Sequence, residues 1–208
     1  MDVPKVVIIN GNGQYAEMFK RMGWEVGSIK DFFTADLIQF TGGEDVTPML
    51  YGEGVHPKTY HNERRDLEEA GYFAFAQRNK IRMAGICRGG QFLNVMNGGK
   101  MYQHVNGHAK GREHDLEDRF SGEQLSVTST HHQMMIPGYN GEIIAVAYES
   151  KVKESYDSVF LANEADVEVV YYDNTKSLCF QPHPEFHNAD STRDYYFELL
   201  NRYLGLKA

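Results

Sequence analysis

The chain has 208 residues, a formal net charge of −8, and 41% hydrophobic and 24% charged residues. This length suits one globular domain and is short for two, so we expect a single domain over residues 1–208. The acidic balance lacks the basic surface that binds phosphate backbones, and no apolar run approaches the roughly 20 residues of a membrane span. These properties argue against nucleic-acid-binding and membrane proteins.

The first hundred residues alternate strand-like and helical patterns, which is typical of a parallel sheet covered by helices. The second half has several strand-like runs without a long helix between them, which predicts antiparallel additions. Residues 102–121 are polar, rich in histidine and weakly periodic, so we expect a surface loop there. The predicted strands are 5–10, 35–40, 81–86, 124–128, 142–148, 167–172 and 177–181, and the predicted helices are 15–22, 65–80, 91–96 and 190–204.

The predicted helix at 65–80 has apolar residues spaced by three and four, which indicates one buried face. The residues of this predicted buried face are Leu67, Ala70, Phe73, Ala74 and Ala76.

The two cysteines have different local settings. They form no disulfide framework, and the N-terminus enters a strand-like run without a signal peptide, so we expect a reducing, cytoplasmic location. Cys87 lies in Gly-Ile-Cys-Arg-Gly-Gly-Gln between a predicted strand and a predicted helix. Glycines around a nucleophile at a sharp strand-to-helix turn are the pattern of a nucleophile elbow. Cys179 lies between Leu178 and Phe180 and is expected to fill the core.

A cysteine nucleophile needs a base and a group that orients the base. Pro184 favours an extended conformation for His183, so that His183 and Glu185 point to the same side of the chain. The carboxylate can then bind one imidazole nitrogen while the other faces the thiol. Gly42 and Gly43 end a predicted strand and leave backbone N–H groups unobstructed, which suits an oxyanion hole.

These motifs together resemble the class I glutamine amidotransferase superfamily, and within it the γ-glutamyl hydrolase branch of peptidase C26 type. The resemblance covers nearly the whole chain. It is carried by Gly-Gly-Glu-Asp-Val-Thr-Pro-Met-Leu-Tyr-Gly-Glu at 42–53, the elbow at 85–91, Ser-Thr-His-His-Gln at 129–133 and His-Pro-Glu at 183–185.

The resemblance implies an α/β three-layer sandwich with a flavodoxin-like, mostly parallel central sheet. It implies a cysteine-dependent enzyme that attacks a γ-glutamyl amide, releases ammonia or an amine, and hydrolyses a thioester without a metal or organic cofactor. Its implied partners are a small γ-glutamyl substrate and, as an alternative to free hydrolysis, a separate ATP-dependent synthetase or ligase that receives the ammonia. A homodimer is also compatible with it. The implied roles are Cys87 as nucleophile, His183 as acid and base, Glu185 as its orienting group, Gly43 and Arg88 as oxyanion hole, and Gly42, Gln91, His131, His132 and Gln133 as substrate-binding residues.

The sequence departs from the family pattern in two places. Pro182 precedes the catalytic histidine where the family usually has an aromatic residue. The loops at 54–65 and 103–125 are shorter than in typical hydrolases of this branch. Because such loops shape specificity for the amine, the sequence does not determine which amine the substrate carries.

Three other functions compete with this one. Gly11, Gly13 and Ala16 after a strand, with Asp31 further on, outline a dinucleotide-binding fingerprint. A metal hydrolase could use one of two histidine-containing sets, and a non-catalytic binding module could use the same fold. The two candidate metal sets are His104, His108, His114 and Asp115, and His183, Glu185 and His187.

Overall fold

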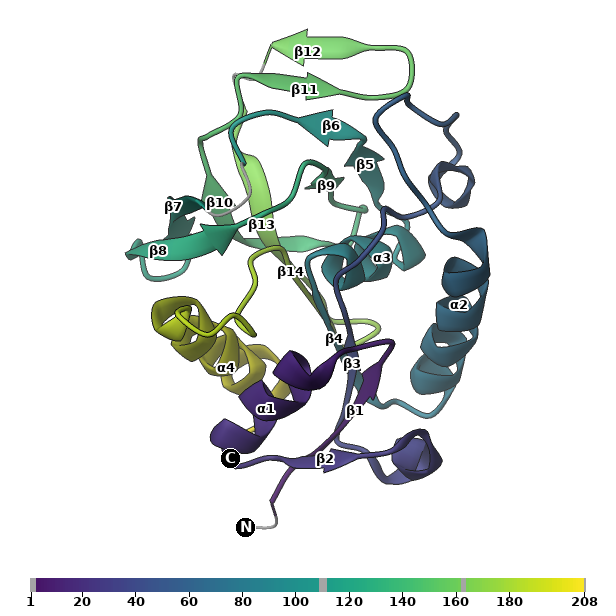
Figure 1. The fold of residues 1–208 in the computed structure, drawn as a ribbon, viewed down its shortest axis with the longest axis vertical. Helices are drawn as coiled ribbons and strands as arrows, with labels where there is room; N and C mark the ends of the chain where they lie inside the picture. Colours follow the sequence, from purple (N-terminus) through teal and green to yellow (C-terminus); the bar gives the residue numbers. More distant parts are fainter. Residues whose placement is uncertain (1–2, 109–111, 162–163, 208) are drawn as a thin grey trace.

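A nine-stranded sheet forms the centre of the molecule in the computed structural model, which describes residues 3–108, 112–161 and 164–207 (Figure 1). Its strands are β1 (Lys5–Ile9), β2 (Glu25–Gly27), β3 (Leu37–Phe40), β4 (Arg82–Ile86), β7 (Arg112–Asp118), β8 (Gln124–Ser129), β10 (Glu142–Ala147), β13 (Asp166–Tyr172) and β14 (Ser177–Phe180). They lie in the order β2-β1-β3-β4-β14-β13-β10-β7-β8. The pairings from β2 to β14 are parallel and those from β14 to β8 are antiparallel. The predicted parallel sheet with antiparallel additions is confirmed.

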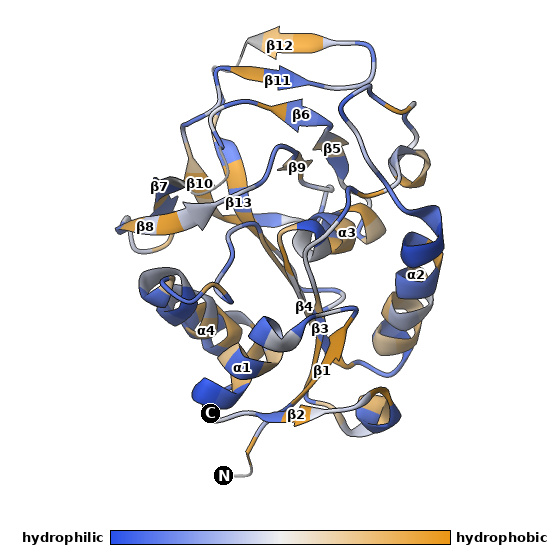
Figure 2. Ribbon diagram, viewed as in Figure 1, coloured by the Kyte–Doolittle hydropathy of each residue, from blue (hydrophilic) through white to orange (hydrophobic). Residues whose placement is uncertain are grey.

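Helices cover both faces of the sheet (Figure 1). Helices α1 (Gly13–Arg21) and α4 (Asp190–Leu204) pack on one face, where Phe19 and Leu200 join strand residues in one buried cluster. Helices α2 (Glu63–Arg78) and α3 (Arg88–Met96) pack on the other, where Phe73 and Phe92 join a second cluster. Figure 2 shows an apolar β1 inside these layers and hydrophilic first turns of α2. No helix in the described part of the chain has the length and apolar character needed to cross a membrane.

Smaller elements lie near both ends of the sheet. They are the 3₁₀ helices η1 (Ile29–Thr34) and η2 (Pro48–Tyr51), a two-stranded sheet of β5 (Lys100–Tyr102) and β9 (Met134–Ile136), and a three-stranded sheet of β6 (His104–Val105), β11 (Val152–Glu154) and β12 (Val159–Leu161).

The predicted loop at 102–121 is wrong over most of its described length, and residues 109–111 of it lie outside the described residues. β6 and β7 fall inside it, and β7 pairs with both β8 and β10. Its inward positions are His114, Leu116 and Asp118, all buried. Because two of the three are polar, β7 lacks the apolar alternation that predicts a strand.

The predicted buried face of the second helix also needs correction. Phe73 and Ala76 are buried as expected and Ala70 is half-buried, but Leu67 is 72% exposed and Ala74 is exposed too. Asp66 and Glu69 are buried in its place, because both form ion pairs with the buried Arg88. Hydrophobic spacing could not show this, since the partner lies on another helix.

The topology brings three strand ends together. β3, β4 and β14 are parallel neighbours, so their carboxyl ends lie at one edge of the sheet. The chain leaves this edge through Thr41, Cys87 and Gln181. In sheets of this kind, that edge is where ligands bind.

Candidate active site

Cys87 lies on a sharp turn between β4 and α3. Its φ of 51° and ψ of −114° put a non-glycine residue in a region that L-amino acids rarely adopt. A Cβ at Gly85 would lie 2.2 Å from the Gly89 carbonyl oxygen, and one at Gly89 would lie 2.5 Å from backbone atoms of Phe40. The turn therefore requires the glycines of the predicted elbow. It places the thiol at the N-terminus of α3, where the helix dipole favours negative charge.

His183 and Glu185 follow β14 and form a hydrogen-bonded pair. His183 Nδ1 lies 2.6 Å from Glu185 Oε1. The His183 backbone N–H donates to Thr128 Oγ1 at 2.8 Å, which ties the segment to β8. The imidazole stacks on Phe186, with ring centroids 4.6 Å apart and planes 9° apart. The aromatic contact that Pro182 does not supply on one side of the histidine thus comes from the residue after Glu185.

Cys87 and His183 meet beside Gly42. A Cβ on Gly42 would lie 3.2 Å from His183 Cε1 and 3.8 Å from Cys87 Cβ. Burial tends to lower the pKa of His183, but the charge of Cys87, together with Glu185, outweighs burial and raises this pKa to about 10. A thiol beside an imidazole that a carboxylate orients is the arrangement needed for nucleophilic attack on a carbonyl.

Gly43 and Arg88, the predicted oxyanion-hole residues, both line a pocket that opens at Cys87. Gly43 has a φ of +146°, and a Cβ there would lie 2.0 Å from Arg65 Nη1. Arg65 Nη2 donates to the carbonyls of Thr41 and Gly42, each at 3.0 Å. Arg65 therefore fixes the direction of these two peptide groups just before Gly43.

The Arg88 side chain anchors the start of α3 to α2. It is 1% exposed and forms ion pairs with Asp66 and Glu69. Glu69 also accepts from Arg65 Nε at 2.8 Å, so the same helix holds both sides of the predicted oxyanion hole. The sequence predicted a helix that begins at Arg65 and Asp66, but it did not predict these ion pairs.

The pocket has a volume of about 170 Å³ and is walled by both halves of the sheet. Four of the five predicted substrate-binding residues line it. Gly42 does not, and its N–H donates to Tyr15 Oη at 3.0 Å. The lining residues are Gly43, Glu44, Asp45, Tyr60, Cys87, Arg88, Gln91, Thr130, His131, His132 and Gln133.

The polar side chains of this wall are held by protein groups. Gln91 Nε2 donates to Gln181 Oε1 at 3.2 Å, and His132 Nε2 lies 3.1 Å from Asp45 Oδ1. His131 Nδ1 lies 3.1 Å from the Gln133 carbonyl oxygen. The other His131 ring nitrogen faces a buried carboxylate, so the ring turns its polar atoms into the protein interior.

Sequence reasoning missed two residues beside the reacting atoms. Gln181 Nε2 donates to Cys87 Sγ at 3.6 Å and is fully buried. Tyr15 contacts Gly42, and burial together with the Glu185 charge raises the pKa of its phenol. A polar residue ending the predicted apolar strand 177–181, as Gln181 does two residues before His183, was the available signal.

The competing functions gain little from the geometry. Asp31 accepts hydrogen bonds from the backbone N–H and the hydroxyl of Ser28 in a capping box, so a local role accounts for it. His108 and His114 of the first metal set lie side by side, with ring centroids 4.9 Å apart. Asp115 is exposed on the opposite side of β7, so the complete set does not converge. In the second set, His187 is exposed whereas His183 and Glu185 are buried.

The Peptidase C26 family model matches residues 29–185. A glutamine amidotransferase-like protein of Lactococcus lactis, YvdE, is 31% identical over 76% of this chain and 70% of its own length. A protein assigned as a glutamine amidotransferase in Mycobacterium tuberculosis is 30% identical over 74% of this chain. The chain spans 54% of the Mycobacterium protein and 41% of the Enterococcus hirae protein NtpR, so it covers about half the length of these relatives.

Solved structures share the fold at low identity. A glutamine amidotransferase from Thermotoga maritima has a TM-score of 0.61 and 13% identity, and covers 97% of this chain and 86% of its own. A protein from Thermoplasma acidophilum, assigned as one of the subunits of GMP synthase, has a TM-score of 0.64 and 14% identity, over 99% of this chain and 94% of its own.

Proposed function

Because the chain belongs to the peptidase C26 family of the class I glutamine amidotransferase-like superfamily, we propose that it hydrolyses a γ-glutamyl amide through a thioester on Cys87. The observation that carries the proposal is the meeting of Cys87, on its strained turn, with the hydrogen-bonded His183–Glu185 pair. The substrate is glutamine or a γ-glutamylamine.

The proposed reaction has two halves. In the first, His183 takes the proton of the Cys87 thiol, and the thiolate Sγ attacks the γ-carbonyl carbon. The carbonyl oxygen takes the negative charge, next to the Gly43 and Arg88 amides. The tetrahedral intermediate collapses as the C–N bond breaks, and protonated His183 gives its proton to the leaving nitrogen. In the second half, His183 removes a proton from water, the hydroxide attacks the thioester, and glutamate leaves as the C–S bond breaks.

The pocket supports recognition of the glutamyl group. That group carries an ammonium and a carboxylate, which require an acidic partner and hydrogen-bond donors. Asp45 supplies a carboxylate, and Gln91 and His132 supply donors on the same wall. The Gly43 and Arg88 amides complete the binding of the reacting carbonyl.

The test is a panel of glutamine and several γ-glutamylamines, with glutamate release as the readout. We expect release from at least one of them, and we expect iodoacetamide to label Cys87 and abolish activity. Substrate should slow the labelling, because both reagents need the same thiol. Labelling at Cys179 with Cys87 unmodified, or full activity after Cys87 is labelled, would contradict the proposal.

A second candidate is a glutaminase subunit that delivers ammonia to a separate ATP-dependent synthetase or ligase. It is supported by the Thermoplasma neighbour assigned to GMP synthase, which the chain matches over 94% of that neighbour. The same panel separates the two functions. Turnover of γ-glutamylamines by the isolated chain indicates a hydrolase, whereas glutamine turnover that requires an added synthetase indicates a glutaminase subunit.

A further inference from the structure

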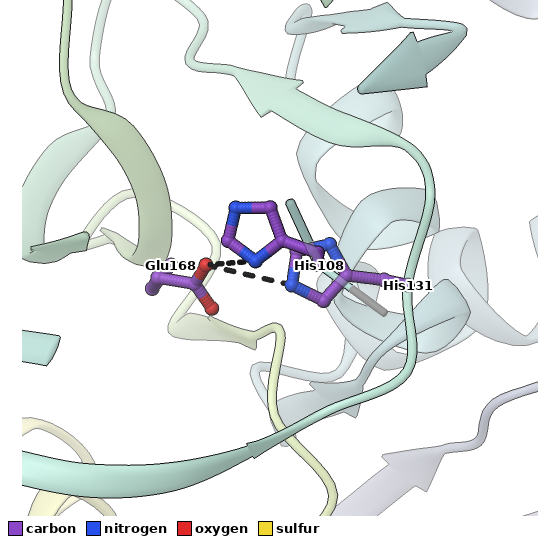
Figure 3. Close-up of side chains that lie close together, drawn as sticks. All are labelled: His108, His131 and Glu168. Carbon is purple, nitrogen blue, oxygen red and sulfur yellow. Dashed lines mark ion pairs between the residues drawn. The ribbon is translucent and has the colours of Figure 1, made fainter. Parts of the chain in front are cut away.

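A cluster of buried histidines and one carboxylate lies behind the pocket wall, apart from Cys87. It comprises His108, which precedes β7, His114 on β7, His131 just after β8, and Glu168 on β13. Figure 3 shows His108 and His131 turned toward the same carboxylate oxygen of Glu168. The side chains of His108 and Glu168 are fully buried, and that of His131 is 1% exposed.

The Glu168 carboxylate faces three histidines without an ordinary hydrogen bond to any of them. Neither of its oxygens accepts a hydrogen bond within the described residues. A buried carboxylate without compensation is costly, so a positive charge belongs beside it. Hydrogen bonds from protonated histidines would bring nitrogen within about 2.7–2.9 Å of the oxygen. The nitrogens of His108, His114 and His131 instead lie 3.5, 3.3 and 3.5 Å from Oε1.

These distances fit ligands arranged around an ion. With metal–ligand bonds of about 2.1 Å, the corners of a tetrahedron lie about 3.4 Å apart. One ligand atom from each of His108, His131 and Glu168 can be chosen so that all three lie within 4.8 Å of one another. His114 approaches the same carboxylate oxygen from β7.

In His108 and His131, the ring nitrogen that faces away from Glu168 is bound by an oxygen, as is usual for a metal-bound histidine. His108 Nε2 lies 3.0 Å from Asp166 Oδ2, and His131 Nδ1 lies 3.1 Å from the Gln133 carbonyl oxygen. Both oxygens can only accept, so these nitrogens carry the hydrogen, and the nitrogens facing Glu168 present lone pairs. A carboxylate or carbonyl behind a metal-bound histidine fixes its tautomer in this way. The Ser129 hydroxyl, 3.3 Å from His108 Nδ1, is the one weak competitor within the described residues.

Asp166 is itself firmly placed. Its Oδ2 accepts the backbone N–H groups of Glu149 at 2.9 Å and Ser150 at 2.7 Å, and Lys153 Nζ lies 3.0 Å from its Oδ1. Lys153 therefore balances the charge of Asp166, and Glu168 is left to be balanced by something else.

We propose that His108, His131 and Glu168 bind a structural divalent transition-metal ion, best matched by Zn²⁺. Imidazole and carboxylate ligands at tetrahedral spacing suit this ion. It would tie β7, β13 and the 130–133 segment together. Because His131 and Gln133 also line the pocket, the ion would hold the wall of the candidate active site without touching the reacting atoms. The proposal does not depend on the proposed function.

The test measures metal in tag-free protein produced in zinc-supplemented medium. We expect about one zinc per chain by mass spectrometry. Glu168→Gln, which keeps the side-chain shape and removes the charge, should lose the zinc. Asp166→Asn should weaken zinc binding about 10- to 100-fold, because it only supports a ligand. Wild-type protein that holds no zinc, either as isolated or after refolding with Zn²⁺, would overturn the proposal.

Two controls separate this site from the reactive thiol. His187→Gln, at an exposed histidine, and Cys87→Ser should both retain zinc. Loss of zinc in Cys87→Ser would place the metal at Cys87 and overturn the proposal. If Glu168→Gln does not fold, cobalt-substituted wild-type protein decides. Tetrahedral Co²⁺ absorption without a thiolate charge-transfer band supports the site, whereas a thiolate band contradicts it.

Discussion

The parallel and antiparallel halves of the sheet build opposite sides of the pocket by different means. On the parallel side, backbone conformation places the reacting groups: Cys87 and Gly43 have positive φ, and Gly89 permits contact between α3 and β3. Ion pairs of Arg65 and Arg88 then support this backbone. On the antiparallel side, buried polar side chains such as His131 and Glu168 hold the wall. Backbone positioning leaves a local mark in the sequence, because it needs glycine at fixed places. Side-chain networks leave none, because their members come from separate strands.

Replacing the proposed nucleophile gives the largest expected effect, and it lies on the parallel side. Cys87→Ala should lower kcat for glutamate release by on the order of 10³-fold or more, since it removes the sulfur on which the proposed thioester forms. Cys179→Ala is the matched control, because Cys179 is fully buried in the core, away from the pocket. Its turnover should stay near that of the wild type. Equal losses in both variants would show that stability, and not chemistry, was lost.

The Glu185 carboxylate should set the alkaline limit of activity. The charges of Cys87 and Glu185 raise the pKa of His183 to about 10, so the imidazole keeps its proton for the leaving group into alkaline solution. Glu185→Gln removes one of these charges and lets burial lower that pKa. We expect kcat/KM to fall about 10²- to 10⁴-fold, and its alkaline limb to move to lower pH. A pH profile with an unmoved limb would contradict this role.

The buried ion pairs of Arg88 should dominate the stability of the elbow. Arg88→Met leaves Asp66 and Glu69 buried without this partner, so urea unfolding should show a loss of about 3–5 kcal/mol. Arg64→Met, at an exposed position on the same helix as these two carboxylates, should change stability by less than about 0.5 kcal/mol. If the two variants unfold alike, α2 does not anchor the start of α3.

Two glycines, each within a helix, should respond to alanine substitution with changes of opposite sign in the free energy of unfolding. Gly89→Ala would put a Cβ 2.5 Å from the backbone of Phe40, whereas a Cβ at Gly71 meets no described atom within 4 Å. Gly89→Ala should destabilise by about 1–3 kcal/mol through overpacking. Gly71→Ala should stabilise by up to about 1 kcal/mol, because alanine is the better helix former. Thermal unfolding that gives both the same sign would show that close packing does not explain Gly89.

Features determined by adjacent residues could be predicted from the sequence, whereas features that depend on residues distant in sequence could not. The buried strands and the elbow were predictable because a few adjacent residues determine each of them. β7 was missed because two of its three inward residues are polar. Asp66 and Glu69 were absent from the predicted buried face because their partner Arg88 is distant in sequence. The approach of His108, His131 and Glu168 could not be predicted until three separate strands or loops were placed. The single-domain prediction and the catalytic roles remain predictions.

The smallest effect is expected on the antiparallel wall, at His132. Its side chain lines the pocket, is 41% exposed and lies 3.1 Å from the Asp45 carboxylate. It is neither buried in the core nor next to a strained backbone. His132→Ala should raise KM about tenfold, equivalent to about 1.4 kcal/mol, and leave kcat nearly unchanged, since it removes binding that substrate and transition state share. Steady-state kinetics on the preferred substrate would check it. A fall in kcat at constant KM would instead show that the antiparallel wall takes part in the chemistry, and the division between the two halves would no longer hold.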